Sequence, residues 1–124
     1  MKSAQDYLAE ANAVVPKLDT KDGISKHGQT GVVFVDVRDS AAITETGTIA
    51  GALRIPRGFI EFAADEATQF HHPQMDKDAD IILVCAAGGQ AALAGRTLVD
   101  MGYKHVSNVG GFGTWKDEGG PVES

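Results

Sequence analysis

The sequence has a single cysteine, Cys85, and no long apolar segment among its 124 residues. One thiol cannot form a disulfide within the chain, and neither a Cys-x-x-Cys pair nor the Cys/His spacing of a structural zinc site is present. No stretch approaches the roughly 18 consecutive apolar residues of a membrane span, and residues 1–19 lack the apolar core of a signal peptide. We therefore expect a cytoplasmic protein with no membrane partner.

Positive charge is also scarce, with 11 Lys and Arg residues against 17 Asp and Glu residues and a formal net charge of −6. This balance argues against nucleic acid and anionic membrane surfaces as partners. It does not exclude one small anion, because a local group of N–H donors can oppose the overall field. The length predicts one domain over residues 1–124, with a helix over about 3–15 as an extension at its start.

Strand-like and helix-like patterns alternate along the chain. The segments 32–37 and 81–84 are short, β-branched and apolar on both faces, as in buried parallel strands. Shorter strands are expected over 52–55 and 106–109 and near Leu18. Helices are expected over residues 20–26, 41–46 and 91–101, from Arg57 onward and around Trp115, with a long loop over 66–80. Such alternation predicts an α/β fold in which right-handed crossovers connect the strands of a parallel sheet.

The cysteine stands between a predicted strand and a predicted helix, where the chain reads Cys85-Ala-Ala-Gly-Gly-Gln90. A glycine-rich loop of this kind turns its N–H groups inward and leads to the positive end of a helix, so it stabilises an anion or a thiolate. A lone cysteine is most often a buried apolar residue without chemistry. However, strand ends that face such loops are where open α/β sheets bind ligands. The pattern predicts one reactive sulfur.

Other polar residues stand at neighbouring strand ends. Asp36 and Arg38 follow the strand 32–37, and we expect them to form a structural ion pair near the site. Arg57 follows Pro56 at another strand end and is a candidate cation for the substrate. The adjacent His71 and His72 point apart and have no third partner, so no metal site is predicted.

Four motifs, taken together, resemble single-domain rhodaneses. They are Asp36-Val-Arg38, Gly47-x-Ile-x-Gly-Ala-x-x-Ile-Pro56, Cys85-x-x-Gly88 and Gly110-Gly-Phe-x-x-Trp115, and the similarity covers about residues 19–122. The resemblance implies a three-layer α/β/α fold around a five-stranded parallel sheet. It also implies that Cys85 opens a six-residue loop ending at Gln90.

The resemblance further implies a sulfurtransferase that works without a metal or organic cofactor. Its cysteine would take a sulfane sulfur from a donor such as thiosulfate or a persulfide and pass it to a thiol or to cyanide. The partners would then be small molecules, and the protein a monomer or a homodimer. The substrate would be bound by Arg57 and by the loop residues Ala86, Ala87, Gly88, Gly89 and Gln90.

Three positions depart from the family pattern. Ala86 and Gln90 stand where the family often carries cations, and Thr48, expected in a turn, replaces a common histidine. Gln90 can brace the loop by hydrogen bonds but supplies no charge. The neutral loop leaves an alternative, a weakly catalytic or non-catalytic module that senses sulfane sulfur or binds a partner. A cysteine phosphatase of related fold would need Cys-x5-Arg, and Ala91 stands at that position.

Overall fold

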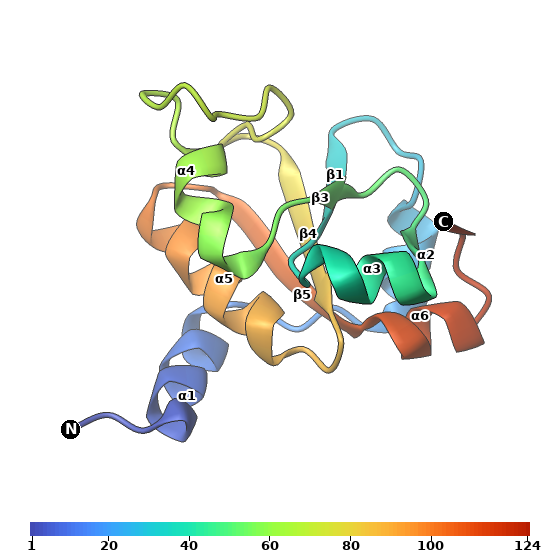
Figure 1. Cartoon of the computed structure of the whole chain (residues 1–124), viewed down its shortest axis with the longest axis horizontal. Coiled ribbons are helices and arrows are strands. Elements are labelled where there is room, and N and C mark those ends of the chain that lie inside the picture. The colour runs from blue at the N-terminus through green and yellow to red at the C-terminus, as the bar shows by residue number, and fades with distance from the viewer.

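The computed structural model describes all residues from 1 to 124, and at its centre lies a sheet of four parallel strands (Figure 1). The strands are β1 (Val32–Asp36), β3 (Leu53–Arg54), β4 (Asp80–Cys85) and β5 (His105–Gly111), in the order β3-β1-β4-β5. The most apolar segments, β1 and β4, occupy the two central positions, where both faces of a strand are covered. The predicted α/β fold with a parallel sheet is confirmed.

The sheet has four regular strands rather than the five expected, because the fifth position is reduced to a single bridge. Lys17 pairs with Asn108 at the outer edge of β5. Leu18 N donates to Asn108 O (2.8 Å), and Asn108 N donates to Pro16 O (2.9 Å). Pro16 has no N–H to continue the ladder, and helix α2 (Thr20–Lys26) begins two residues after Leu18. The edge segment is therefore too short for a strand.

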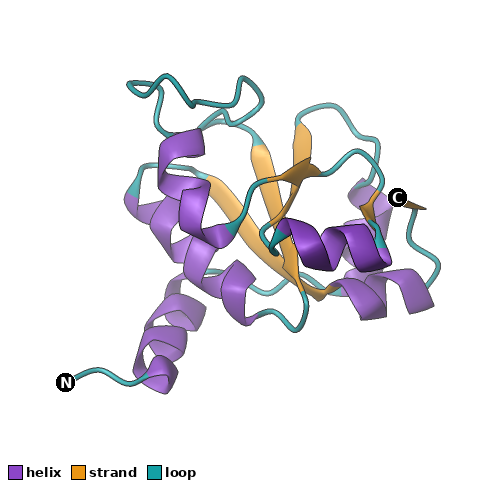
Figure 2. Cartoon of the chain, in the orientation of Figure 1, coloured by secondary structure: helices purple, strands orange, loops and turns teal.

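Helices cover both faces of the sheet and complete the three layers (Figure 2). One face carries α5 (Gly89–Asp100) and α4 (Ile60–Ala64), which follows the 3₁₀ turn Arg57–Phe59, and α1 (Ala4–Val14) packs on α5. The other face carries α2 and α6 (Phe112–Asp117), and α3 (Ser40–Thr46) follows β1. Strands β2 (Thr48–Ile49) and β6 (Val122–Glu123) form a separate antiparallel pair. None of the helices combines the length and the apolar character needed to cross a membrane.

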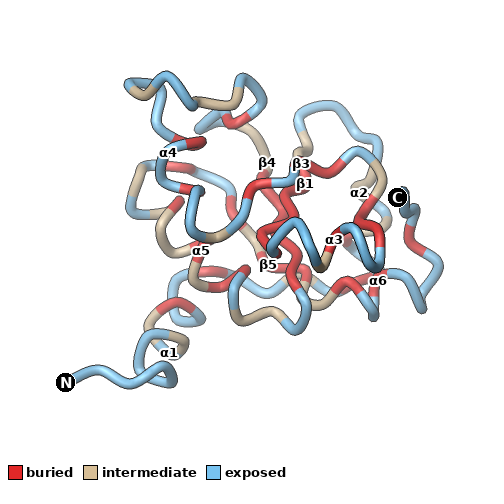
Figure 3. The backbone as a smooth tube through the Cα atoms, in the orientation of Figure 1, coloured by how far each residue is buried: buried red, intermediate tan, exposed pale blue.

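Buried residues concentrate along the central strands (Figure 3). Most of them belong to one of two apolar clusters, which lie on opposite faces of the sheet. Side chains alternate along β4, so Ile81, Leu83 and Cys85 join the cluster under α4 and α5. Ile82 and Val84 join the smaller cluster, which contains Phe112 and the fully buried Trp115. The sulfur of Cys85 therefore lies on the α5 side of the sheet.

The helix expected over residues 3–15 is present as α1. It begins with a capping box, in which Ser3 Oγ accepts from Asp6 N (3.2 Å) and Asp6 Oδ2 accepts from Ser3 N (2.8 Å). Just past its end, the buried Val15 packs against Gly95 of α5, where a Cβ atom would lie 2.9 Å from the valine methyl groups. Only glycine permits this approach, so α1 is docked on the domain by a close contact.

The loop between α4 and β4 is tied down by Tyr103. The phenol shares its single O–H between Ala64 O (2.8 Å), where α4 ends, and Met75 O (3.2 Å), within the loop. Burial, together with nearby carboxylates, raises the pKa of Tyr103 to about 12. The hydroxyl therefore keeps its proton, and both hydrogen bonds, up to strongly alkaline pH.

Candidate active site

The sulfur of Cys85 is held by main-chain N–H groups at the carboxyl end of β4. The side chain is almost fully buried, at 1% exposure. Its Sγ atom accepts a hydrogen bond from Gly88 N at 3.0 Å and from Ala91 N at 3.4 Å. The loop from 86 to 90 thus curls around the sulfur with its donors turned inward. Such donors favour a negative charge on the sulfur.

Helix α5 begins earlier than the sequence suggested, at Gly89 rather than near Ala91. Gly88 is its N-cap and has a φ of +99°, in the left-handed region that glycine adopts without strain. Ala91 is then the third helical residue, and its N–H is one of those left without a partner inside the helix. The sulfur uses this donor and lies at the positive end of a 12-residue helix.

The side chains of the loop add little to this arrangement. Gln90 lies in the first turn of α5, is exposed, and its carboxamide makes no hydrogen bond. The expectation that it braces the loop is therefore wrong, because the earlier helix start turns this side chain to the surface. Ala86 and Ala87 are exposed as well, and Gly88 and Gly89 are partly buried. The polar surroundings of the sulfur come from the main chain.

The Gly-Gly motif of β5 lets the loop lie against the sheet. Cys85 pairs with Gly111, and a Cβ atom on Gly111 would lie only 2.5 Å from the carbonyl oxygen of Ala86. Gly110 has a φ of +91°, and the β4–β5 register shifts between Leu83 and Val84. This bulge and the two glycines bring β5 close to the start of the loop.

Asn108 is a site residue that the sequence analysis missed. It is buried in β5, where its Nδ2 donates to Gly88 O (2.9 Å) and its Oδ1 accepts from Gly110 N (2.8 Å). The local indication was a pair of polar residues, Ser107 and Asn108, between Val106 and the Gly-Gly motif. Asparagine in a strand interior is unusual enough to suggest a specific hydrogen bond.

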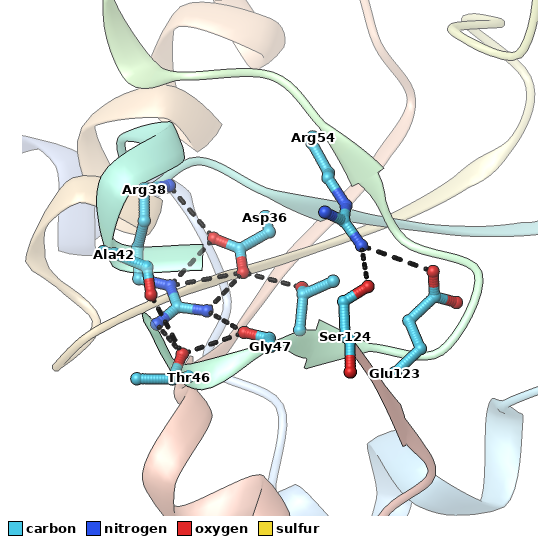
Figure 4. A network of polar contacts seen from close by, with 9 residues as sticks. Asp36, Arg38, Ala42, Thr46, Gly47, Arg54, Glu123 and Ser124 are labelled. Atoms are coloured by element: carbon cyan, nitrogen blue, oxygen red, sulfur yellow. Dashed lines mark hydrogen bonds and ion pairs between the residues drawn. The ribbon is translucent and has the colours of Figure 1, made fainter. Parts of the chain in front are cut away.

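Asp36 and Arg38 form a buried ion pair where β1 ends, next to β4 (Figure 4). Arg38 Nη2 lies 2.8 Å from Asp36 Oδ2, and Arg38 Nε donates to Oδ1 at 3.1 Å. Neither side chain exceeds 6% exposure. The pair therefore lies in a low-dielectric environment, where each charge requires the other.

The remaining polar atoms of this pair bind the segment after α3. Arg38 donates from Nη1 to Thr46 Oγ1 and from Nη2 to Gly47 O, both at 2.9 Å. Thr48 Oγ1 donates to Asp36 Oδ2 (2.7 Å), and the Arg38 guanidinium stacks over Phe112. Thr48 is thus a buried residue of strand β2 and not the turn residue that was expected. Its burial is tolerated because its hydroxyl donates a hydrogen bond to the Asp36 carboxylate.

Arg57 lies along α5, and its side-chain contacts do not include the loop. Its Nη1 lies 3.4 Å from Glu61 Oε1, and its Nη2 donates to Thr97 Oγ1 at 3.3 Å. It lines a hollow shared with Leu93 and Arg96 rather than one lined by residues 85–90. The structure therefore brings together Cys85 and residues 86–91, but does not place Arg57 beside them.

Two hollows flank the loop. One, of about 330 Å³, lies between α1, β5 and residues Ala87–Gly89, and Lys17 is at its edge. The other, of about 300 Å³, lies between α6, Arg38 and Ala86, and includes Lys116. Neither lysine takes part in an ion pair. Both come from segments far from the loop in sequence, so no local pattern indicated them.

The two adjacent histidines are held by their own loop. His71 Nε2 contacts Met75 O at 2.9 Å, and His72 Nδ1 accepts from Gln74 N at 3.1 Å. No group of three or more His, Cys, Asp or Glu side chains is placed to hold a metal ion. Each imidazole is therefore in contact with a main-chain group of the same loop.

The parallel sheet, with a buried thiol at a strand end and N–H donors at the start of the following helix, defines a class of α/β proteins with a cysteine in an anion-binding loop. Within this class the chain belongs to the Rhodanese-like domain family, whose pattern matches residues 19–118. Helix α1 and the edge segment around Lys17 precede the matched region. The family resemblance that the motifs suggested is thereby confirmed.

Individual relatives span most of the chain. A sulfurtransferase of Allochromatium vinosum is 32% identical over 92 residues, which is 73% of this chain and 78% of the relative. A Rhodopseudomonas palustris protein of unknown function, described as a possible tyrosine phosphatase, has a solved structure that is 39% identical. It matches with a TM-score of 0.93 over 99% of this chain and 96% of its own.

A further solved structure is the polysulfide-sulfur transferase homodimer of Wolinella succinogenes. It is 26% identical to this chain, and the match covers 94% of this chain and 83% of the relative, with a TM-score of 0.74. The likeness thus extends through the sheet and both helical layers.

Proposed function

We propose that this protein is a sulfurtransferase that carries sulfane sulfur as a persulfide on Cys85. The observation that carries the proposal is the placement of Cys85 Sγ between the N–H groups of Gly88 and Ala91 at the start of α5. In a rhodanese-family chain, this arrangement suits a cysteine whose negative charge is on Sγ before the transfer and on the outer sulfur of the persulfide after it. Two relatives named as a sulfurtransferase and as a polysulfide-sulfur transferase support the same activity.

The proposed reaction has two displacement steps and needs no external oxidant or reductant. The Cys85 thiolate attacks the outer sulfur of thiosulfate, a sulfur–sulfur bond forms, and the bond to the sulfonate breaks to release sulfite. With a polysulfide donor the leaving group is the shortened polysulfide. A thiolate or cyanide then attacks the terminal sulfur of the persulfide, which regenerates the Cys85 thiolate and releases a new persulfide or thiocyanate. This is covalent catalysis in two steps.

The loop stabilises this chemistry through its main chain. We expect the N–H donors that hold the thiolate to hold the outer sulfur once it is attached. The loop side chains carry no charge, so a dianionic donor gains less here than it would beside an arginine. We therefore expect persulfide formation from both donors. The ratio of the polysulfide rate to the thiosulfate rate should be higher for this protein than for one whose loop contains cations.

Intact-protein mass spectrometry tests the proposal directly. The protein is incubated separately with thiosulfate and with polysulfide, desalted, and then treated with cyanide. We expect one added sulfur atom per chain, lost on cyanide treatment with formation of thiocyanate. Cys85→Ser is the matched control and should gain no sulfur. Absence of the adduct with both donors would overturn the proposal.

Other functions give different results in the same experiment. A sensing module, favoured by the neutral loop, would form the adduct but would not pass the sulfur to cyanide or to a thiol, and a partner-binding module would not form the adduct. A phosphatase, suggested by the description of the Rhodopseudomonas palustris relative, would hydrolyse an aryl phosphate. We expect no such hydrolysis, because Ala91 stands where the phosphate-binding arginine of Cys-x5-Arg would be. Size-exclusion chromatography would show whether the chain is a monomer or, like the Wolinella succinogenes relative, a homodimer.

A further inference from the structure

We propose that Asn108 is a positioning residue, which fixes Gly88 in the one conformation that directs its N–H at the sulfur of Cys85. This inference rests on the proposed function, since the sulfur is taken to be the reacting atom. Asn108 lies on β5 and does not touch the sulfur itself. Its Nδ2 donates to Gly88 O at 2.9 Å, while Gly88 N donates to Cys85 Sγ at 3.0 Å.

Gly88 requires an external restraint because glycine is the most flexible residue. It has a φ of +99° and a ψ of −14°, one of several regions open to a residue without a Cβ atom. Its carbonyl oxygen accepts from Ala92 N (3.0 Å), as the first hydrogen bond of α5, and from Asn108 Nδ2. Both acceptor positions of this oxygen are thus used. Holding this carbonyl fixes the ψ angle of Gly88 and, with it, the relation of its N–H to the helix.

Asn108 can act as the restraint because every polar group it carries is itself held. Because of the bulge between β4 and β5, Gly110 N is available to the side chain of Asn108. It donates a hydrogen bond to Asn108 Oδ1 at 2.8 Å. The main chain of Asn108 bonds to Pro16 O and Leu18 N at the sheet edge. Exchanging the two ends of the carboxamide would place N–H against N–H and oxygen against oxygen. Its orientation is therefore determined.

The chemistry of asparagine is specific at this position. Aspartate has the same shape and keeps the acceptor for Gly110 N, but its carboxylate cannot donate to Gly88 O. Leucine fills a similar volume and loses both hydrogen bonds. The chain has one other asparagine, Asn12 of α1. It lines the hollow between α1, β5 and residues 87–89, as Asn108 does, but makes no hydrogen bond to the loop. Asn12→Leu is therefore a matched control.

The test compares Asn108→Asp, Asn108→Leu and Asn12→Leu with the unmodified protein in steady-state sulfur transfer from polysulfide. We expect kcat to fall about tenfold in both Asn108 variants, as for the loss of a buried hydrogen bond. KM for the donor should stay within about twofold, because Asn108 is buried and its carboxamide is engaged by Gly88 O and Gly110 N. Asn12→Leu should leave both constants unchanged. Circular dichroism and thermal unfolding show whether each variant is folded.

Amide hydrogen exchange supplies a second measurement that does not depend on activity. Exchange at Gly88 and Ala91 should be at least about fivefold faster in Asn108→Asp, because the restraint on the loop is lost. Exchange at amides in the centre of β4 should not change. A folded Asn108→Asp protein with normal kcat and normal exchange at Gly88 would overturn the inference. Failure of the unmodified protein to form a persulfide would instead overturn the proposed function, and the exchange data would still decide whether Asn108 orients Gly88.

Discussion

The ends of β1 and β4 lie next to each other at the same edge of the sheet, but they stabilise negative charge in opposite ways. At the end of β1, the Asp36 carboxylate is neutralised by the Arg38 guanidinium and completed by the Thr48 hydroxyl. At the end of β4, the Cys85 sulfur is held by the N–H groups of Gly88 and Ala91 alone. One region is a network of side chains, and the other is a turn of main chain.

The difference shows why the charge of Arg38 does not substitute for the missing cations of the loop. Every nitrogen of its guanidinium donates within the β1 network, and its positive charge is balanced by Asp36. The positive groups left near Cys85 are therefore the main-chain N–H groups at the start of α5 and the lysines of the two flanking hollows, Lys17 and Lys116. It follows that side-chain substitutions in the β1 network should lower the free energy of unfolding. Substitutions of glycine in the loop after β4 should instead change the main-chain conformation around the sulfur.

The largest expected effect is the removal of the nucleophile. Cys85→Ser should abolish sulfur transfer while the protein remains folded, because a hydroxyl is close in size to a thiol but cannot carry the persulfide. Transfer of sulfur to cyanide is the assay, and circular dichroism checks the fold. Substantial transfer by the folded variant would place the reactive group elsewhere.

The next effect tests the β1 network. Arg38→Met leaves the Asp36 carboxylate buried without its partner, and we expect a loss of about 3–5 kcal/mol in the free energy of unfolding. Urea denaturation measures it. The matched control is Arg54→Met, which breaks an exposed pair with Glu123 and should cost less than about 1 kcal/mol. Equal losses in the two variants would show that the burial of the Asp36–Arg38 pair is energetically unimportant.

A smaller effect tests the main-chain geometry of the loop. Gly88→Ala must adopt a φ near +99° or distort the loop, so we expect a cost of about 1–2 kcal/mol in stability. Because the nearest atom to the added Cβ is 3.6 Å away, the cost comes from the backbone rather than from a clash. Gly58→Ala, with open space around it and no positive φ, is the control and should be neutral or slightly stabilising. Sulfur transfer should fall only in Gly88→Ala.

The smallest effect concerns charge at the loop. Gln90→Arg should raise kcat/KM for thiosulfate by roughly two- to fivefold, because an exposed charge contributes up to about 1 kcal/mol. Gln90→Glu should lower it by a similar factor, and both changes should shrink at high salt. A less charged donor should respond less to either substitution. If the Arg and Glu variants behave alike toward thiosulfate, charge at position 90 does not influence donor choice.

Much of this fold could be predicted from local patterns. Central strands were recognisable because β1 and β4 are apolar runs rich in β-branched residues, and the strand–Gly–helix pattern placed Cys85 correctly at the carboxyl end of β4. The start of α5 was misplaced because it depends on the positive φ of Gly88, which two adjacent glycines leave undecided. Local periodicity finds elements better than it finds their ends.

The residues that were missed depend on contacts between distant segments. Thr48 is in a strand only because residues 122–123 pair with β2, and its hydroxyl is buried only because Asp36 accepts it. Asn108 reaches a carbonyl group 20 residues earlier in the chain. Lys17 and Lys116 come near the loop from the two ends of the sequence. No window of sequence contains both partners of any of these contacts.

The strand order β3-β1-β4-β5 has a consequence for synthesis on the ribosome. Val32 of β1 pairs with Asp80 of β4, so at about 5–20 residues per second the chain needs roughly 2–10 s to make the partner after β1 emerges. During that time only the two residues of β3 can cover one edge of β1. The apolar segment Val-Val-Phe-Val is therefore the part of the nascent chain most prone to intermolecular pairing, and slower translation between β3 and β4 should increase aggregation more than a pause elsewhere.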